Sequence, residues 1–586
     1  MAEILSFMGK YSFNRQKTKK EKQLFSLPLI LAVSPFVGGL SYHFLIEAFG
    51  LIILGMLCCT IYRKGEFVYN SGIHFILEMI FVSGVIISCF FAVDHGTAVE
   101  GAMRLLPILL FCLFLNQTDV DGRAAMAFLP RAAALMVCIC LLGYFILPLR
   151  ELFYYKSRMG GFFQYPNSCA FFYLFSLVIL IQDAESRKKI QVRTESILLI
   201  LGIILTGSRT TFVLFLCTIL YFLIRKKKKA LFWGLTGGVL VMAVYFAGTY
   251  LIRADSLMRL FRISLTDQYF LERLLFWKDG IGQICRHPFG MGYGGYFYLQ
   301  PVFQSGKYTT RFVHNGWLQM ILDYGIVTGI SILIMVIRRI TDRNTDRNVK
   351  ELLLLFLVRM CFDFDLQYGF FMLCLAALLH PKAGEKRSIR IKSRMKSGML
   401  IMAVAVACLL LYMSAADFFM MTGHADRAYE IAPWKTEAAE QILVLSDRYT
   451  DHQILAEKII RQNEYSHVAW KTVSYAAFEQ GDYAEMSEAL EKRVRIEKFN
   501  KYAYQDYIEL HYAAMERCRE QNRIDEAKWL GQRALEIKEI RKEAKGSISD
   551  LARSCKDAPG LKWTKNDKRY LKEIEAVLKN EKGGGF

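Results

Sequence analysis

Long runs of apolar residues alternate with short polar segments through the first 417 positions of the 586-residue chain. The runs are roughly 16 to 23 residues long, and a helix of about 20 residues spans a hydrocarbon layer of ~30 Å. After residue 417 the runs stop. The pattern therefore predicts a membrane-embedded part followed by a soluble part.

The runs predict an all-α, polytopic membrane protein with about 12 to 13 transmembrane helices. The polar stretches divide the chain into an N-terminal segment (1–24), a membrane domain (25–417) with a long loop at 253–313, and a C-terminal segment (418–586). Two short spans near 351–380 form a predicted hairpin whose tip, Asp363-Phe364-Asp365, faces outward. The predicted spans are 25–43, 44–62, 74–93, 101–117, 130–149, 168–184, 194–207, 209–225, 230–252, 314–337, 351–364, 366–380 and 398–417.

Basic residues set the orientation of these spans, because cytoplasmic loops carry an excess of lysine and arginine. If the basic N-terminal segment is cytoplasmic, alternation of the spans places nearly every basic cluster on that same side. The loop 150–167, the turn at 207–209, the long loop 253–313 and the whole C-terminal segment then lie outside. The cytoplasmic clusters are Arg63/Lys64, Arg123, Arg187–Lys189, Arg225–Lys229, Arg338–Arg347 and Lys386–Lys396.

Composition supports the membrane assignment and removes some alternatives. The chain is 54% hydrophobic with a mean hydropathy of +0.24, which is too apolar for a soluble protein of this length. The net charge of +20 does not indicate nucleic acid binding, because the basic clusters adjoin apolar spans. Most of the 14 cysteines lie within spans, and we see no disulfide framework or metal-ligand spacing. The basic stretch before Phe25 leads into a hydrophobic hairpin, so no cleavable signal peptide is expected.

The C-terminal segment repeats a helix-hairpin pattern. Tyr475–Tyr483 is followed by Ala489-Leu490, and Tyr512–Met515 is followed by Asn522–Ala527 and Ala534-Leu535. Small residues at helix contacts and a period slightly above ~34 residues resemble degenerate tetratricopeptide repeats. A plain helical bundle is the alternative. Such a domain binds partners or braces the membrane part.

Arginines recur at the predicted outer boundary of the membrane. Arg158 opens the stretch Arg-Met-Gly-Gly-Phe-Phe-Gln-Tyr-Pro-Asn that ends at Asn167, which taken alone also suits turn and helix-start chemistry. Arg209 lies in the turn Gly207-Ser208-Arg209. An arginine there either snorkels to lipid headgroups or binds a lipid-linked phosphate through its planar fork, and both interpretations stay open.

The long loop holds the other candidates. Arg273-Leu-Leu-Phe-Trp277 predicts a short amphipathic helix, and the glycine-rich stretch 286–296 lacks the lysine of a nucleotide-binding P-loop. His314-Asn315 marks the start of the next span. A histidine at a helix start is commonly a satisfied polar residue, but a neutral imidazole at a membrane boundary can accept a proton near pH 7.

Arg359 and Asp363 are four residues apart, which places them on one face of a helix. They form a predicted ion pair within or near the bilayer. A structural role is the favoured interpretation of this pair.

Taken in order, these segments resemble the O-antigen ligase and polysaccharide polymerase superfamily of bacterial membrane glycosyltransferases. Many members carry a histidine before the hairpin aspartate, whereas this chain has Arg359 nearby, which leaves the roles of Asp363 and Asp365 open. The C-terminal segment is similar to that of members fused to tetratricopeptide repeats. The matching pieces, spread over about 150 to 380, are Arg158–Asn167, Gly207–Arg209, Arg273–Trp277, His287–Gly295, and His314-Asn315 with Leu318 and Gly325.

The resemblance implies an enzyme of the cytoplasmic (inner) membrane that takes a glycan from an undecaprenyl-diphosphate carrier. The glycan passes, outside the membrane, to a hydroxyl of a glycan, lipid or protein acceptor, without nucleotide, cofactor or metal. The implied roles are diphosphate binding for Arg209 and Arg273, general base for His314, and further substrate contacts for Arg158 and Asn315. The expected partners are the lipid-linked donor, membrane lipid and a protein bound by the repeats, but no nucleic acid.

Two other classes of function fit parts of the pattern. About thirteen spans also suit a transporter, although transporters usually place polar or broken helices near the middle of the bilayer. Here the polar residues gather at the outer boundary instead. A noncatalytic scaffold that presents the C-terminal segment is the third hypothesis, but a single span would suffice as its anchor.

Overall fold

The computed structural model describes residues 27–118, 120–226, 268–381, 386–446 and 448–580. The predicted N-terminal segment 1–24, the predicted span 230–252 and the start of the loop 253–313 lie outside the described residues. The chain divides into two compact units. Unit 1 comprises Met1–Glu78, Arg104–Ser264 and Ile332–Leu410, and unit 2 comprises Met79–Met103, Leu265–Ser331 and Leu411–Phe586.

Helices dominate the described part of unit 1, with two short antiparallel strand pairs that the sequence did not predict. β1 (Glu66–Asn70) pairs with β4 (Lys386–Arg390), and β2 (Tyr154–Tyr155) pairs with β3 (Arg158–Met159). The helices are η1 (Ser34–Phe36), η2 (Gly38–Leu40), α3 (His43–Lys64), η3 (Ala124–Met126), α6 (Leu129–Gly143), α7 (Leu147–Phe153), η4 (Gly161–Phe163), α8 (Pro166–Gln182), α9 (Lys189–Thr206), α10 (Arg209–Lys226), α17 (Arg347–Arg359), η5 (Asp365–Gln367) and α18 (Gly369–Leu379). Four helices contribute residues to both units: α4 (Gly72–Phe90), α5 (His95–Asn116), α16 (Ile326–Thr341) and α19 (Ser393–Met421).

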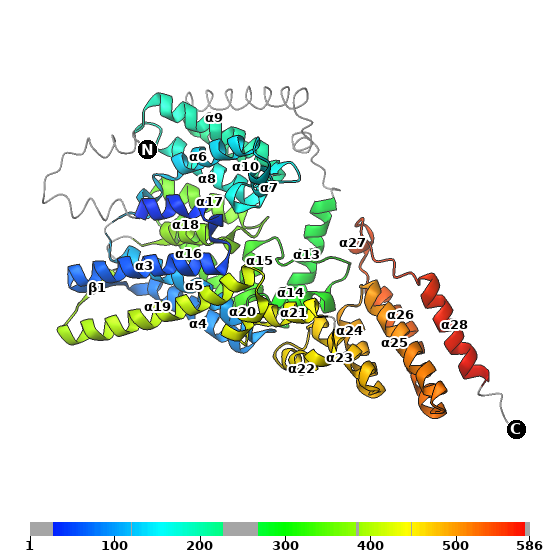
Figure 1. Cartoon of the computed structure of the whole chain (residues 1–586). Coiled ribbons are helices and arrows are strands. Elements are labelled where there is room, and N and C mark those ends of the chain that lie inside the picture. The colour runs from blue at the N-terminus through cyan, green and yellow to red at the C-terminus, as the bar shows by residue number, and fades with distance from the viewer. Residues whose placement is uncertain (1–26, 119, 227–267, 382–385, 447, 581–586) are drawn as a thin grey trace. The chain divides into compact units, whose positions relative to one another are not determined.

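Helix α8 forms the centre of unit 1. Pro166 occupies its first turn, where the missing backbone N–H costs nothing, and every residue from Pro166 to Ile181 is buried. In Figure 1, α8 lies among α6, α9 and α10, which all contact it. Gly202 lets α9 approach closely, because a Cβ there would lie 2.7 Å from Val137 Cγ2 and 2.8 Å from the Tyr173 ring. A helix buried on all sides fits a position inside a bundle.

The loop segment of unit 2, by which we mean residues 268–324, has its own apolar core. The helices α13 (Gln268–Ile284), α14 (Gly295–Phe303) and α15 (Gly316–Tyr324) pack around buried side chains that include Phe276, Tyr296 and Leu322. The backbone N–H of Met291 donates to the carbonyl of Leu322 at 2.7 Å, so the glycine-rich stretch lies against α15.

The C-terminal part of unit 2 consists of paired helices. α23 (His467–Gln480) packs on α24 (Tyr483–Ile496), and α25 (Lys501–Glu520) runs beside α26 (Ile524–Gly546) (Figure 1). Buried alanines, among them Ala477, Ala489, Ala514 and Ala527, lie in the apolar clusters of these helices. The tetratricopeptide-like assignment stays a prediction. The helices are α20 (Ala425–Ile431), α21 (Thr436–Leu445), η7 (Thr450–His452), α22 (Gln453–Gln462), α23 (His467–Gln480), α24 (Tyr483–Ile496), α25 (Lys501–Glu520), α26 (Ile524–Gly546), α27 (Asp550–Arg553) and α28 (Lys565–Asn580).

Polar contacts join the C-terminal helices to other segments of unit 2, the loop segment among them. The Lys435 ammonium donates to Glu100 Oε1 and Asp417 Oδ1, each at 2.5 Å, and all three side chains are buried. The backbone N–H of Ser549 donates to the carbonyl of Ser305 at 3.0 Å. The loop and the C-terminal segment are therefore in contact within unit 2, and the side of the membrane on which they lie stays a prediction.

One acidic side chain in this contact region is expected to make stability depend on pH. Burial, together with the nearby Asp94 and Glu437, raises the pKa of Glu440 to about 7, although the Ser466 hydroxyl donates to it at 2.5 Å. A carboxyl whose folded-state pKa is raised stabilises the fold at pH values below its ordinary pKa of 4.5. That stabilisation is lost as the pH rises through about 7.

Replacing Glu440 with glutamine is therefore expected to stabilise the purified protein at pH 8 more than at pH 5. The difference between the variants should widen over this range by about 2 kcal/mol, or several degrees in melting temperature, because a tenfold change in proton affinity corresponds to ~1.4 kcal/mol. Thermal melts of both proteins at a series of pH values measure it. A difference that stays constant from pH 5 to pH 8 would contradict this role of Glu440.

Most of the predicted spans within the described residues coincide with helices, but several are broken, among them 130–149, which is divided between α6 and α7. The predicted span 314–337 is two helices, α15 and α16, because Gly325 has φ +90° and a Cβ there would lie 2.7 Å from the carbonyl carbon of Phe289. The predicted span 25–43 contains η1 and η2 with a break at Gly38 and Gly39, both at φ +60°. Glycine adopts this backbone conformation without strain, whereas a regular helix cannot continue through it.

Five helical segments within the described residues are long and apolar enough to cross a membrane. The shorter apolar helices Leu27–Phe36, Pro166–Gln182 and Gly369–Leu379 fall on other predicted spans. The full number of spans and their orientation stay predictions. The five segments are His43–Lys64, Gly72–Phe90, His95–Asn116, Ala124–Gly143 and Ser393–Met421.

Candidate active site

Arg158 of unit 1 is held between two helices. It follows the tight turn at Lys156 and Ser157, which have φ of 47° and 64°. Its Nε donates to the carbonyl of Thr206 at 2.8 Å, and its Nη2 donates to Asn167 Oδ1 at 2.8 Å. Thr206 is the last residue of α9, where the negative end of the helix dipole favours a cation. Arg158 therefore links the end of α9 to the start of α8.

Asn167 also connects the start of α8 to the α17–α18 hairpin. Its amide Nδ2 donates to Asp363 Oδ2 at 2.9 Å and to the hydroxyl of Tyr165 at 2.8 Å. The Tyr165 hydroxyl in turn donates to Asp363 Oδ1 at 3.1 Å. Ser168, the next residue of α8, donates to Asp365 Oδ1 at 2.6 Å. The start of α8 thus donates hydrogen bonds to both hairpin carboxylates.

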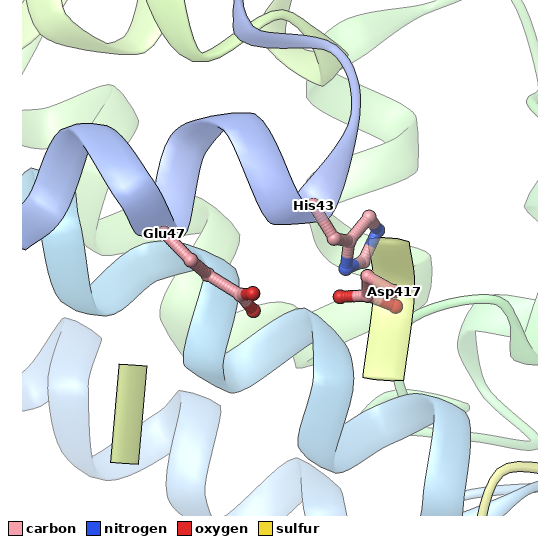
Figure 2. Close-up of side chains that lie close together, drawn as sticks. All are labelled: His43, Glu47 and Asp417. Carbon is pink, nitrogen blue, oxygen red and sulfur yellow. The ribbon is translucent and has the colours of Figure 1, made fainter. Parts of the chain in front are cut away.

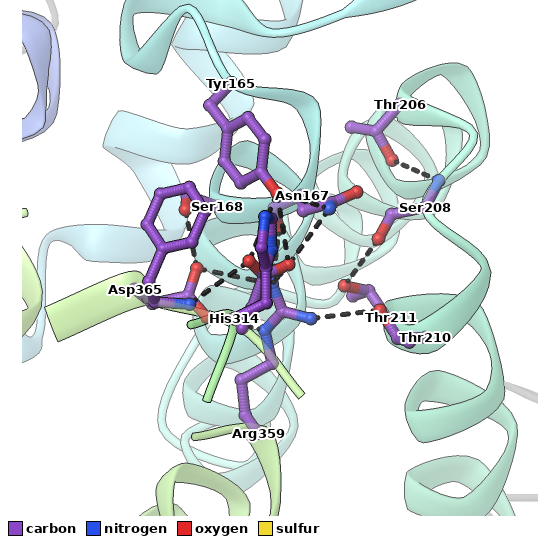
Figure 3. Close-up of polar contacts among 12 residues, drawn as sticks. Tyr165, Asn167, Ser168, Thr206, Ser208, Thr210, Thr211, His314, Arg359 and Asp365 are labelled. Carbon is purple, nitrogen blue, oxygen red and sulfur yellow. Dashed lines mark hydrogen bonds and ion pairs between the residues drawn. The ribbon is translucent and has the colours of Figure 1, made fainter. Parts of the chain in front are cut away.

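Arg359 completes this network from the end of α17. Its guanidinium pairs with Asp363 Oδ2 at 3.2 Å and Asp365 Oδ2 at 2.7 Å, and all three side chains are at most 1% exposed. Its Nη1 donates to the Thr210 hydroxyl of α10 at 3.1 Å. Figure 3 shows Arg359 and Asp365 with the side chains from the starts of α8 and α10. The predicted Arg359–Asp363 pair is confirmed, and Asp365 is a second partner that the spacing did not reveal.

Removing Arg359 is expected to destabilise the protein strongly. Arg359→Ala leaves two buried carboxylates without their cation, and breaking a buried ion pair from one side costs about 3 to 5 kcal/mol. Arg347→Ala is the matched control on the same helix, since its side chain is 61% exposed and an exposed ion pair contributes about 1 kcal/mol or less. Thermal unfolding in detergent measures both changes. Equal melting temperatures for the two variants would show that the buried network does not stabilise the fold.

Arg209 is the first residue of α10 and is half-buried. Gly207 ends α9 with φ 60°, and the Ser208 hydroxyl donates to Thr211 Oγ1 at 3.1 Å. The backbone N–H groups of a helix start carry partial positive charge and bind anions readily. Arg209 adds a full positive charge there, next to Thr210, which Arg359 holds in place. This is a chemically suitable position for a phosphate ligand.

Arg273 of unit 2 lies on α13. The predicted amphipathic helix at 273–277 is confirmed, since α13 extends from Gln268 to Ile284. Arg273 and Trp277 are one turn apart, and both are partly exposed. The Trp277 indole Nε1 donates to the carbonyl of His314 at 3.3 Å. α13 therefore carries Arg273, which is predicted to bind the diphosphate, and Trp277, which contacts the predicted base His314.

His314 is fixed by its neighbours in an unusual backbone conformation. Its φ is 53°, in the left-handed region that few residues other than glycine adopt. The N–H of Val313 donates to Gln319 Oε1 at 2.8 Å, and the Phe276 ring centroid lies 6.0 Å from that of the His314 imidazole. Such a conformation persists only where the surrounding structure holds it, and residues of this kind cluster at functional sites.

Asn315 caps α15, since its side-chain Oδ1 accepts a hydrogen bond from the N–H of Leu318 at 3.0 Å. This confirms that the helix starts directly after His314-Asn315. The capping bond uses the same oxygen that a substrate donor would need. Its predicted substrate contact stays a prediction.

The predicted site residues fall into two groups. Arg158 and Arg209 belong to unit 1, where both adjoin residues of the Arg359 network. Arg273, His314 and Asn315 belong to unit 2, where Trp277 links α13 to His314. The sequence pattern did not indicate a role for Tyr165, Ser168 or Thr210. The sequence feature that could have indicated Ser168 and Thr210 is their position directly after Asn167 and Arg209.

His43 and Glu47 lie one turn apart on α3, as Figure 2 shows. Imidazole and carboxylate are suitable metal ligands, but metal sites commonly use three or four protein ligands. Two side chains of unit 1 fall short of that number. We assign no metal to this pair.

Comparison with known proteins supports the superfamily resemblance. The O-antigen ligase family model matches residues 196–333. The match supports glycan ligation or polymerisation in cell-surface polysaccharide biosynthesis, with a lipid-linked glycan donor and a multi-pass membrane protein. No curated protein gives a significant match. The matched segment contains Arg209, Arg273, His314 and Asn315, whereas Arg158 lies before it.

Proposed function

We propose that this chain is a membrane glycosyltransferase that uses an undecaprenyl-diphosphate-linked glycan as its donor. The glycan is transferred to, or polymerised on, an acceptor hydroxyl at the outer face of the cytoplasmic membrane. The observation that carries this proposal is the O-antigen ligase match, because it contains Arg209, Arg273 and His314. The acceptor is a glycan, a lipid or a protein.

Each proposed role follows from the chemistry of the side chain. His314 accepts the proton of the acceptor hydroxyl, whose oxygen attacks the anomeric carbon of the glycan. The bond from that carbon to the diphosphate breaks, and its electron pair leaves with the diphosphate oxygen. Arg209 and Arg273 stabilise the charge that develops on this leaving group. No nucleotide or metal is required.

Arg158 is proposed as a further contact to the donor. In the structure its Nε and Nη2 already donate hydrogen bonds to Thr206 and Asn167. The C-terminal helices, which contact the loop segment within unit 2, are proposed to lie outside the membrane and to bind a protein partner.

Sealed vesicles with the purified protein test both the reaction and its side. Protease treatment from outside identifies vesicles whose C-terminal region faces outward. In those vesicles, donor and acceptor added outside should give glycosylated acceptor without nucleotide. Glycan that crosses the membrane with no new glycosidic bond would indicate a transporter instead. Product formed only from the face opposite the C-terminal region would contradict the proposed side.

A further inference from the structure

Asp279 of α13 organises the loop that follows α14. Its side chain is buried, and its carboxylate accepts three hydrogen bonds: from the N–H of Ser305 at 2.8 Å, from the Ser305 hydroxyl at 2.6 Å and from the Tyr308 hydroxyl at 2.9 Å. Burial, Tyr296 and Asp279 hold the pKa of Tyr308 well above its usual range, so this hydroxyl stays a donor. A buried carboxylate with three donors fixes the positions of all of them.

Aromatic contacts connect Tyr308 to His314. The Tyr308 ring packs on Phe276 with centroids 4.6 Å apart, and the Phe276 ring lies 6.0 Å from the His314 imidazole. Trp277 Nε1 donates to the carbonyl of the same histidine. Phe276, Trp277 and Asp279 all lie within one turn of α13. The Asp279 carboxylate therefore holds the loop that contains Tyr308 in place. This loop packs against the face of α13 that contacts His314.

The C-terminal region contacts this loop through Ser549 and α27. The hydroxyls of Ser305 and Ser549 are 3.0 Å apart, and the N–H of Ser549 donates to the carbonyl of Ser305. Ser549 also caps α27, accepting from the N–H of Ala552 at 3.2 Å. A Cβ on Gly306 would lie 2.6 Å from the Ala552 Cβ, so α27 is seated directly on this loop.

We infer that Asp279 is a positioning residue for His314 and that Ser549, with α27, holds this arrangement from the C-terminal side. The inference rests on the proposed role of His314. It makes the C-terminal region a structural part of the site rather than only a platform for partners. Asp279 does not touch the substrate; it acts by fixing Tyr308 and, through Phe276, the orientation of the imidazole.

Asp279→Asn is expected to lower kcat about tenfold to a hundredfold with the KM for the donor unchanged, because small displacements of a catalytic group have effects of that size. Asparagine keeps the shape of the side chain but has one acceptor oxygen instead of two. Ser549→Ala, the second variant, removes the contact with the Ser305 hydroxyl and the cap of α27, both neutral, and should lower kcat about threefold to tenfold. Ser554→Ala is the control, since its hydroxyl donates only to the carbonyl of Asp550 on the exposed side of the same segment.

A double-mutant cycle with His314→Ala separates positioning from general damage to the fold. If Asp279 acts through His314, the double variant Asp279→Asn/His314→Ala has the turnover of His314→Ala alone. A further loss in the double variant, or wild-type kcat in Asp279→Asn, would overturn the inference and leave the proposed function standing. Wild-type turnover in His314→Ala itself would remove the proposed base and this role of Asp279 together.

Discussion

Replacing His314 with alanine should lower the turnover of a lipid-linked donor by about a hundredfold to ten-thousandfold, which is the usual contribution of a general base. The KM for the donor should change little, because the imidazole acts on the acceptor hydroxyl and not on the diphosphate. The loss should be greatest with weakly acidic acceptor hydroxyls. Steady-state kinetics with the purified protein measure kcat and KM separately.

The control for this variant is His424→Ala. His424 is an exposed residue of unit 2 whose ring contacts the Thr422 hydroxyl. Its removal should leave turnover unchanged. If His314→Ala keeps its melting temperature and still turns over at the wild-type rate, His314 is not the base.

Replacing Arg273 or Arg209 with alanine should weaken the stabilisation of the leaving diphosphate. A hydrogen bond to a charged group contributes about 1.5 to 3 kcal/mol, which corresponds to a loss of about tenfold to a hundredfold in kcat/KM. Lysine at position 273 keeps the charge but not the planar fork, so Arg273→Lys should recover only part of the loss. Kinetics with a donor and with a free polyprenyl diphosphate as inhibitor measure both effects.

Stability measurements separate these arginines from Arg359. Arg209→Ala leaves the bonds from Arg359 to Asp363, Asp365 and Thr210 in place, so it should lower the melting temperature less than Arg359→Ala does. Arg448→Ala is the kinetic control, because its side chain is 83% exposed on the C-terminal segment. An Arg273→Ala protein with kcat/KM equal to that of Arg448→Ala would contradict the diphosphate role.

The apolar runs located many helices closely because their signal is local. The predicted spans 44–62 and 209–225 correspond to α3 (His43–Lys64) and α10 (Arg209–Lys226). Each such run is about as long as the helix it forms and ends at basic or turn residues. The hairpin near 351–380 was predicted for the same reason, and α17 and α18 form its two helices.

The break at Gly325 was not predictable from local sequence. It depends on Pro288 and Phe289, which lie 37 and 36 residues earlier in the chain. Backbone atoms of these two residues would lie within 2.8 Å of a Cβ placed on Gly325. Hydropathy is high on both sides of the break, so a single span was the natural expectation. Only the packing of the loop segment reveals that two helices meet there.

The site shows the same limit. The Arg359–Asp363 pair followed from a four-residue spacing on a helix, but the bond from Ser168 to Asp365 joins residues 197 positions apart. Helical periodicity carries no information about such a contact. The hydrogen bonds that Asp279 accepts from Ser305 and Tyr308 join residues 26 and 29 positions apart, so they too give no local signal.

The most direct measurement of the central claim is the product balance of the reaction. Purified full-length protein is incubated with an undecaprenyl-diphosphate glycan and an acceptor, with no nucleotide, and both products are counted. We expect one free undecaprenyl diphosphate for each new glycosidic bond, because the diphosphate is the leaving group. Glycan binding or movement with no diphosphate released and no bond formed would contradict the account.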